Sequence, residues 1–231
     1  MMHYHGTPIT PNAKLLQLAG HNFCVSFANK QQTKLCHELG QSVMLDNGAF
    51  SVWKRGITID WNKWWEWAEP WLDTPTTWCV LPDLIEGDEE ENDRLADEWA
   101  HVRDGVPVWH FHESLTRLSQ LTNRFGRVCF GSSGAYATVG TPIWHQRAHA
   151  AFNTLVDEFG RVPWVHMLRG MNLSGDVYPF ASVDSTDVAR NHNMGNGDGH
   201  RDIVAMAKRW DGIQCPARWA KAEQLTMEVT A

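Results

Sequence analysis

The chain has 231 residues, of which 43% are hydrophobic, and this size and composition predict a single domain over residues 1–231 with one large core. It has no apolar run of about 18 residues and no signal-peptide pattern, which excludes a membrane-spanning helix and predicts no membrane partner. A formal net charge of -7 disfavours a strongly basic binding module, and five cysteines without a Cys-x-x-Cys pair favour a reducing cytoplasm.

Apolar runs alternate with helix-like segments along the chain. We predict strands at residues 3–8, 23–28, 42–46, 77–81, 106–111, 127–131, 163–168 and 180–184. We predict helices at residues 31–39, 60–72, 89–102, 114–124 and 142–159. This alternation indicates an α/β fold, a compact (β/α)8 TIM-like barrel with at least one trimmed unit. A doubly wound open sheet is the alternative.

Three of the apolar runs lead into an aspartate followed by small or turn-forming residues, and the three acids are Asp46, Asp83 and Asp184. The C-terminal ends of parallel strands lie on one face, so we expect the three carboxylates to share one pocket. Several carboxylates in one pocket suit nucleophilic and acid/base chemistry at a carbon atom. Each aspartate taken alone fits equally well as the N-cap of a following helix.

The acidic residues are concentrated in one segment. Residues 83–104 contain ten acids and two arginines, a local charge of -8, which leaves +1 for the rest of the chain. We predict that residues 86–98 form the solvated face of a helix. The remaining surface can carry a modest basic patch, and we expect Arg201, Lys208 and Arg209 to contact nucleic acid.

Two histidines stand in a His-x-His pattern, His110 and His112, at the end of the run 106–111. Strand alternation places both on one face, which is metal-ligand spacing, and His166 could supply a third ligand. The other interpretation is that one histidine contacts substrate and the other tunes it. We expect no catalytic metal and no cofactor, and we keep a metal-dependent barrel hydrolase as an alternative.

Two further stretches and a group of tryptophans call for an interpretation. Gly131-Ser132-Ser133-Gly134 follows a strand, and such small residues let a backbone with free amides approach a flat ligand closely. The glycine-rich segment 191–200 fits a mobile loop at the active face, or a metal or phosphate site. The tryptophans of 61–71 follow helical spacing and indicate a buried stripe, from which Trp67 departs toward the surface.

Five segments of the chain resemble segments of the tRNA-guanine transglycosylase superfamily, and they occur in the same order as in that family. They are Asp46-Asn47-Gly48-Ala49-Phe50-Ser51, Pro82-Asp83, Gly131-Ser132-Ser133-Gly134, Val165-His166-Met167-Leu168-Arg169-Gly170 and Ala181-Ser182-Val183-Asp184-Ser185-Thr186. The branch that inserts a 7-deazaguanine into DNA, in phages and bacteria, is an especially close candidate. The family's zinc site of three cysteines and a histidine is absent from the sequence, so we expect a barrel without the zinc-binding subdomain.

The resemblance implies that guanine in DNA or tRNA is exchanged for a 7-deazaguanine through a covalent aspartyl-glycosyl intermediate. It implies that Asp184 is the nucleophile and Asp46 the acid/base, the chemistry that base exchange at C1′ requires. The implied substrate-binding residues are Asp83, Phe50, Gly131, Ser132, His110 and Met167. Asp83 would accept hydrogen bonds from the base, Phe50 would stack on one face of it, and Met167 would cover the other face. The amides of Gly131 and Ser132 would donate to the carbonyl of the base, and His110 lies where the family has a glutamine.

Other function classes remain open from the sequence. A nucleoside hydrolase or glycosidase would use the same carboxylates with water as acceptor. A non-catalytic nucleic-acid-binding module is disfavoured by the weak basic signal. The sequence leaves open DNA against tRNA, the particular 7-deazaguanine, and whether a second copy or a helper subunit takes part.

Overall fold

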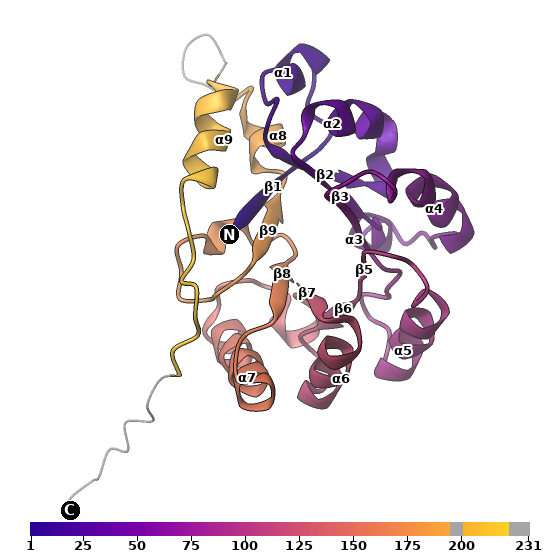
Figure 1. Cartoon of the computed structure of the whole chain (residues 1–231), viewed down its shortest axis with the longest axis vertical. Coiled ribbons are helices and arrows are strands. Elements are labelled where there is room, and N and C mark those ends of the chain that lie inside the picture. Colours follow the sequence, from indigo (N-terminus) through magenta and orange to yellow (C-terminus); the bar gives the residue numbers. More distant parts are fainter. Residues whose placement is uncertain (195–200, 222–231) are drawn as a thin grey trace, which may run out of the picture.

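The computed structural model describes residues 1–194 and 201–221, and its centre is a sheet of parallel strands that curls into a barrel (Figure 1). In the described part of the chain the strands are β1 (Met2–Gly6), β2 (Asn22–Ser26), β3 (Ser42–Asp46), β4 (Thr77–Val80), β5 (Gly105–Val106), β6 (Val108–His110), β7 (Arg127–Gly131), β8 (Trp164–Met167) and β9 (Ser182–Ser185). They are hydrogen-bonded in the order β5-β4-β3-β2-β1-β9-β8-β7-β6.

The two strands at the ends of that order, β5 and β6, are separated by Pro107 alone. Proline has no N–H to donate, so the run expected as one strand over 106–111 is divided at this residue. The Pro107 carbonyl still accepts a hydrogen bond from the Cys129 N–H at 2.9 Å. The barrel therefore closes through the chain itself, with eight positions around its axis, and the predicted TIM-like barrel is confirmed.

Helices surround the strands. In the described ranges they are α1 (Asn12–Leu16), α2 (Thr33–Leu39), α3 (Ala49–Trp53), α4 (Trp61–Ala68), α5 (Glu89–Glu98), α6 (Leu115–Phe125), α7 (Pro142–Phe159), α8 (Asp187–Asn191) and α9 (Ile203–Asp211). Side-chain caps begin several of them, including α6, where the Ser114 hydroxyl accepts from the Arg117 N–H. The connection after β8 contains only a 3-10 turn, η4 (Met171–Leu173), which is a trimmed unit.

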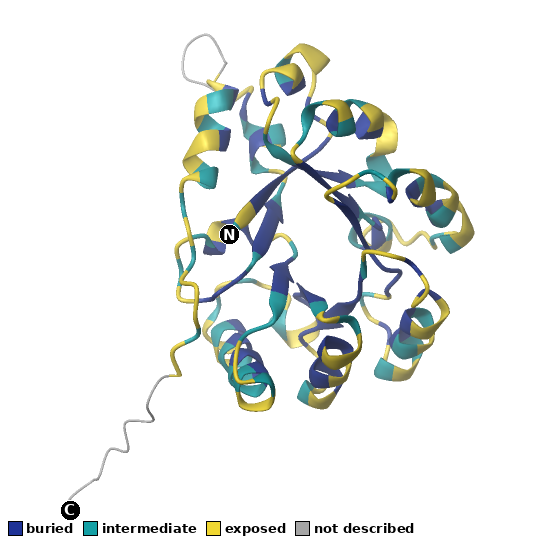
Figure 2. Cartoon of the chain, in the orientation of Figure 1, coloured by how far each residue is buried: buried dark blue, intermediate teal, exposed yellow. Residues whose placement is uncertain are grey.

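Side chains of the strands alternate between the barrel interior and the layer beneath the helices. The interior cluster includes Tyr4, Met44, Trp78 and Cys129, whereas a larger outer cluster packs against α6 and α7. Figure 2 shows the consequence, with buried strands inside and exposed residues along the outer faces of the helices. All five cysteines are free, and four of them are buried. None of the helices in the described ranges has both the length and the apolar character needed to cross a membrane.

An extended segment, residues 212–221, follows α9 and covers part of the outer cluster beside α7 (Figure 1). We call it the C-terminal strap. The Trp219 ring stacks on Phe152 at 5.3 Å between centroids, and its indole N–H donates to Asn153 Oδ1 at 2.8 Å. Cys215 packs against the same cluster. The strap thus covers apolar surface that the trimmed unit after β8 leaves open.

Candidate active site

The three predicted aspartates meet at the mouth formed by the C-terminal ends of the strands. Asp46 is the last residue of β3, Asp83 follows β4, and Asp184 is the penultimate residue of β9. The pKa of Asp46 is raised to about 6, chiefly by burial, and the charges of Asp184 and Asp83 contribute to this rise. A carboxyl group with a pKa near neutrality can both give and take a proton under ordinary conditions.

The Asp184 carboxylate is held at one of its two oxygens. Oδ1 accepts a hydrogen bond from the Arg169 backbone N–H at 2.6 Å and lies 3.3 Å from His166 Nε2. His166 is itself fixed by Ser182, whose hydroxyl lies 2.8 Å from Nδ1. Among the described residues no hydrogen bond reaches Asp184 Oδ2. This arrangement orients the carboxylate and leaves one oxygen free to attack a substrate.

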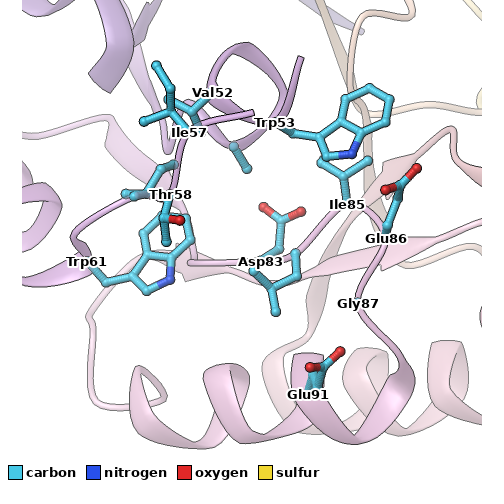
Figure 3. A pocket seen from close by; sticks show the side chains of 13 residues that line it. Val52, Trp53, Ile57, Thr58, Trp61, Asp83, Ile85, Glu86, Gly87 and Glu91 are labelled. Carbon is cyan, nitrogen blue, oxygen red and sulfur yellow. The ribbon is translucent and has the colours of Figure 1, made fainter. Parts of the chain in front are cut away.

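Asp83 is held by two buried partners. Its Oδ1 accepts from the Asn47 amide at 2.6 Å, and its Oδ2 lies 2.8 Å from His110 Nε2. The Asn47 amide also donates to the Leu81 carbonyl, so the turn after β3 and the end of β4 are fixed together. Figure 3 shows the Asp83 carboxylate directed into a neighbouring cavity.

That cavity has a volume of about 290 Å³ and lies between α3 and the segment that joins β4 to α5. Apolar side chains supply most of its wall, with Trp53 and Trp61 facing it and Glu86 and Glu91 near its edge (Figure 3). Pockets for small molecules range from about 300 to 1,000 Å³, so this cavity has the size for a single base rather than a whole nucleotide.

Arg169 brings a positive charge to the three acids, although no pattern in the sequence predicted its place in the site. Its guanidinium carbon lies 3.7 Å from the centre of the Phe50 ring, and Nη2 donates to the Ser132 carbonyl at 3.4 Å. Burial lowers the pKa of Arg169, while the charges of Asp184, Asp46 and Asp83 raise it. Its φ of 56° lies in the left-handed region, which is uncommon outside glycine and typical of functional sites.

His110 is positioned by a buried ion pair. Its backbone N–H donates to Glu113 Oε2 at 2.8 Å, and the same oxygen accepts from Arg117 Nη1 at 2.6 Å. Asn92 donates to the other carboxylate oxygen of Glu113 at 3.0 Å. Burial raises the pKa of Glu113, whereas the charge of Arg117 lowers it. Of this network only Asn92 lies in the acidic segment, which was predicted as the solvated face of a helix, and no pattern in the sequence indicated Glu113 or Arg117.

The second histidine of the pattern faces protein partners. His112 Nε2 lies 3.1 Å from the Gly87 carbonyl, and Nδ1 lies 2.7 Å from the Ser133 hydroxyl. Because a carbonyl only accepts, Nε2 carries the proton and Nδ1 accepts from Ser133. Within residues 1–194 and 201–221, His110, His112 and His166 do not form a metal-ligand cluster. The geometry therefore gives no support to a metal at this His-x-His.

The small residues after β7 lie beside His110. A Cβ atom at Gly131 would lie 2.9 Å from His110 Nδ1, so the close approach requires glycine. The Gly131 carbonyl accepts from the Phe111 N–H, and the Ser132 hydroxyl accepts from the Trp144 indole. The Ser132 contact with Arg169 uses its carbonyl rather than its amide. The expected amide contacts with a base remain a prediction.

Four predictions about single side chains differ from the observed positions. Met167 belongs to the outer cluster beneath the helices, so we remove it from the site. Trp67 is only partly exposed, and its indole donates to the Thr33 hydroxyl at 3.1 Å. Lys208 and Arg209 lie near the C-terminal end of α9. The last residue of this helix, Asp211, contacts His21 just before β2, so this end of α9 lies on the side of the barrel away from the mouth.

Arg201 remains on the mouth side of the barrel. Its N–H donates to the His192 carbonyl, and His192 in turn contacts the Thr10 carbonyl in the connection after β1. Most of the predicted loop 191–200 lies outside the described residues.

The fold and the site together define a (β/α)8 barrel with a cluster of carboxylates and one arginine at the C-terminal ends of its strands. A scan against models of protein families found no match, and a search of curated proteins also found none. The geometry of the site and the resemblance described above are therefore the grounds for a function.

Proposed function

We propose that this protein is a base-exchanging glycosyltransferase that replaces guanine in DNA or tRNA with a 7-deazaguanine. The observation that carries the proposal is the pairing of Asp46 with Asp184 at one mouth. Asp46 has a pKa raised to about 6, whereas Asp184 is held at one oxygen with the other uncommitted. Carboxylates in such different environments can divide acid/base and nucleophilic roles between them.

The proposed reaction has two displacements. In the first, Asp184 Oδ2 attacks C1′ of the sugar, the bond from C1′ to the guanine nitrogen breaks, and Asp46 gives its proton to the departing base. In the second, the Asp46 carboxylate removes the proton from the ring nitrogen of the incoming 7-deazaguanine. That nitrogen bonds to C1′ as the ester bond to Asp184 breaks. Two inversions retain the configuration at C1′, as in retaining glycosidases.

The cavity beside Asp83 supports a base as the group that is recognised. Its carboxylate is directed into an apolar space of about 290 Å³, where it can accept hydrogen bonds from ring and exocyclic N–H groups. Trp53 supplies an aromatic face for stacking, which is the usual way in which proteins hold an extruded base.

The decisive experiment compares the wild-type protein with Asp184→Asn in the exchange of radiolabelled guanine into DNA and into tRNA. We expect the variant to lose turnover and keep base binding, because an amide preserves the shape but is not a nucleophile. Denaturing gels of the wild type with substrate should show a covalent adduct that the variant lacks. Asp73→Asn, at an exposed position far from the mouth, is the matched control. Normal turnover in Asp184→Asn would overturn the proposal.

A nucleoside hydrolase is the second candidate. Its favouring observation is that Lys208 and Arg209 lie away from the mouth, which removes two of the three predicted nucleic-acid contacts. In that case water would resolve the Asp184 ester, and free nucleosides would be cleaved without incorporation of a labelled base. The same assay distinguishes the two, because exchange into a polynucleotide occurs only in the first.

A further inference from the structure

A second cluster of ionisable side chains lies on the outer surface of the barrel wall. Strand alternation directs His3 and His5 of β1 outward, opposite to Tyr4, whose ring belongs to the interior cluster. His21, just before β2, and Asp211, the last residue of α9, meet them there. The sequence thus contains the His-x-His pattern twice, and within the described residues only the copy at 3–5 belongs to a group of three or more ligand-type side chains that could hold one ion.

The distances in this cluster are short. Asp211 Oδ1 lies 3.0 Å from His5 Nε2, and Asp211 Oδ2 lies 2.6 Å from His21 Nδ1. One ligand atom from each of these three residues lies within 4.8 Å of the others. His3 Nδ1 lies 3.9 Å from Asp211 Oδ1, and its other ring nitrogen is 3.0 Å from the Ser174 hydroxyl.

Burial makes this arrangement unlike a surface group of charges. The side chains of His3 and His5 are 1% and 0% exposed, and that of His21 is 13% exposed. His5 Nδ1 is buried and has no hydrogen-bond partner among the described residues. Imidazoles from two chain segments that meet a carboxylate from a third form a donor set that suits Zn²⁺.

We propose that His5, His21 and Asp211 are three ligands of a structural Zn²⁺. His3 lies next to the position that a fourth ligand would occupy. Zinc bonds of about 2.0–2.2 Å place tetrahedral ligand atoms roughly 3.3–3.5 Å apart, which the observed atoms reach by small shifts. The contact of His3 with Ser174 matches the outer-shell hydrogen bond that orients a ligating imidazole.

The ion would fasten α9 to the barrel. Only Ile203 and Ala207 are fully buried in this helix, and its C-terminal end is held by the Asp211 cluster. The site lies on the outside of β1, whereas Asp46, Asp83 and Asp184 lie at the mouth. It is therefore independent of the proposed base exchange.

The test measures zinc in the purified full-length chain and then follows re-binding of Zn²⁺ and Co²⁺ after chelation. We expect one zinc per chain, a visible Co²⁺ spectrum of the tetrahedral type, and a higher melting temperature on adding zinc. His21→Gln removes a ligand at the rim of the cluster. The zinc affinity of this variant should fall by more than the roughly 10- to 100-fold that the loss of an outer-shell partner costs. His101→Gln, at an exposed position on the surface, is the matched control.

The wild-type measurements keep the test independent of any variant that fails to fold. No binding of Zn²⁺ or Co²⁺ by the wild type would overturn the proposal and leave a hydrogen-bonded cluster only. Equal zinc affinity in His21→Gln and the wild type would also overturn it, because the ion would then lie elsewhere. Neither result bears on the base-exchange assay, which reports on the mouth.

Discussion

The guanidinium group of Arg169 covers one face of the Phe50 ring, while the Arg169 backbone N–H orients Asp184. A single residue just after β8 therefore contacts both the proposed nucleophile and the Phe50 ring, which the resemblance predicts as a stacking platform. For a base to stack on this face of Phe50, the side chain of Arg169 must first move away, and the backbone contact need not change.

Arg169→Gly should therefore bind free guanine severalfold more tightly than the wild type. Glycine adopts a φ of 56° without strain, so the turn and its N–H are kept. A cation–π contact is worth about 0.5–2 kcal/mol, and the variant has none to break. Equilibrium dialysis with radiolabelled guanine measures the change. In Phe50→Ala/Arg169→Gly the gain should disappear, and a gain that persists there would show that Phe50 is not the platform.

Asp46→Asn should stabilise the protein at neutral pH. The pKa of Asp46 is raised to about 6 by burial, so between roughly pH 4 and 6 the native chain keeps a proton that the unfolded chain releases. The free energy of unfolding of the wild type consequently falls as pH rises through this interval. Asparagine does not ionise, so the variant should be about 1–3 kcal/mol more stable at pH 7.5 and no more stable below pH 4.

Urea denaturation at these two pH values checks this expectation. Asp73→Asn is again a suitable control, since the Asp73 side chain is 94% exposed. A pH-independent difference between Asp46→Asn and the wild type would mean that the Asp46 carboxyl ionises in the native chain as it does in the unfolded one.

The cavity makes a separate prediction about base affinity. Trp53→Ala should weaken guanine binding by about 1–3 kcal/mol through lost stacking, and Asp83→Ala by a similar amount through a lost hydrogen-bond acceptor. Trp71→Ala removes a tryptophan that stacks on His37 at 4.5 Å and does not line the cavity, so it should leave binding unchanged. Calorimetry with a soluble 7-deazaguanine gives all three values. If Trp53→Ala and Trp71→Ala changed the affinity for the base equally, the base would bind outside this cavity.

Salt dependence should locate the nucleic-acid contacts on the mouth side. Lys54 and Arg55 are exposed just after α3, and Arg201 lies on the same side. Replacing these three with glutamine should flatten the slope of log affinity against log salt by up to roughly 0.9 per lost phosphate contact on duplex DNA. Replacing Lys208 and Arg209, at the far end of α9, should leave the slope unchanged. The opposite result would place the polynucleotide along α9.

The sequence was sufficient for the three carboxylates, because strand ends in a parallel barrel share one face and each acid follows an apolar run. It was insufficient for Met167. Strands buried on both sides read as continuous apolar runs, so their pattern does not say which alternate residues face the interior. In β8 the interior face carries His166, and Met167 points the other way.

The sequence also did not predict the positions of residues that lie on the segments connecting the strands. Arg169 lies in a left-handed turn after β8, and the residue that adopts this conformation is the arginine itself rather than a glycine, so the sequence does not predict the turn at this position. Trp53 is the last residue of the short helix α3, which was not predicted, and it lines the cavity. Lys208 and Arg209 were misplaced because α9 was not predicted, and its direction carries them away from the mouth.

The C-terminal strap has a consequence for how the chain is made. The apolar layer beside α7 is completed only when Trp219 stacks on Phe152. During synthesis the ribosome delivers β8 and its neighbours long before the strap. Until the strap has been synthesised, part of the aromatic layer of the nascent barrel is therefore exposed to solvent. Exposed apolar surface of this kind is what chaperones and neighbouring chains bind.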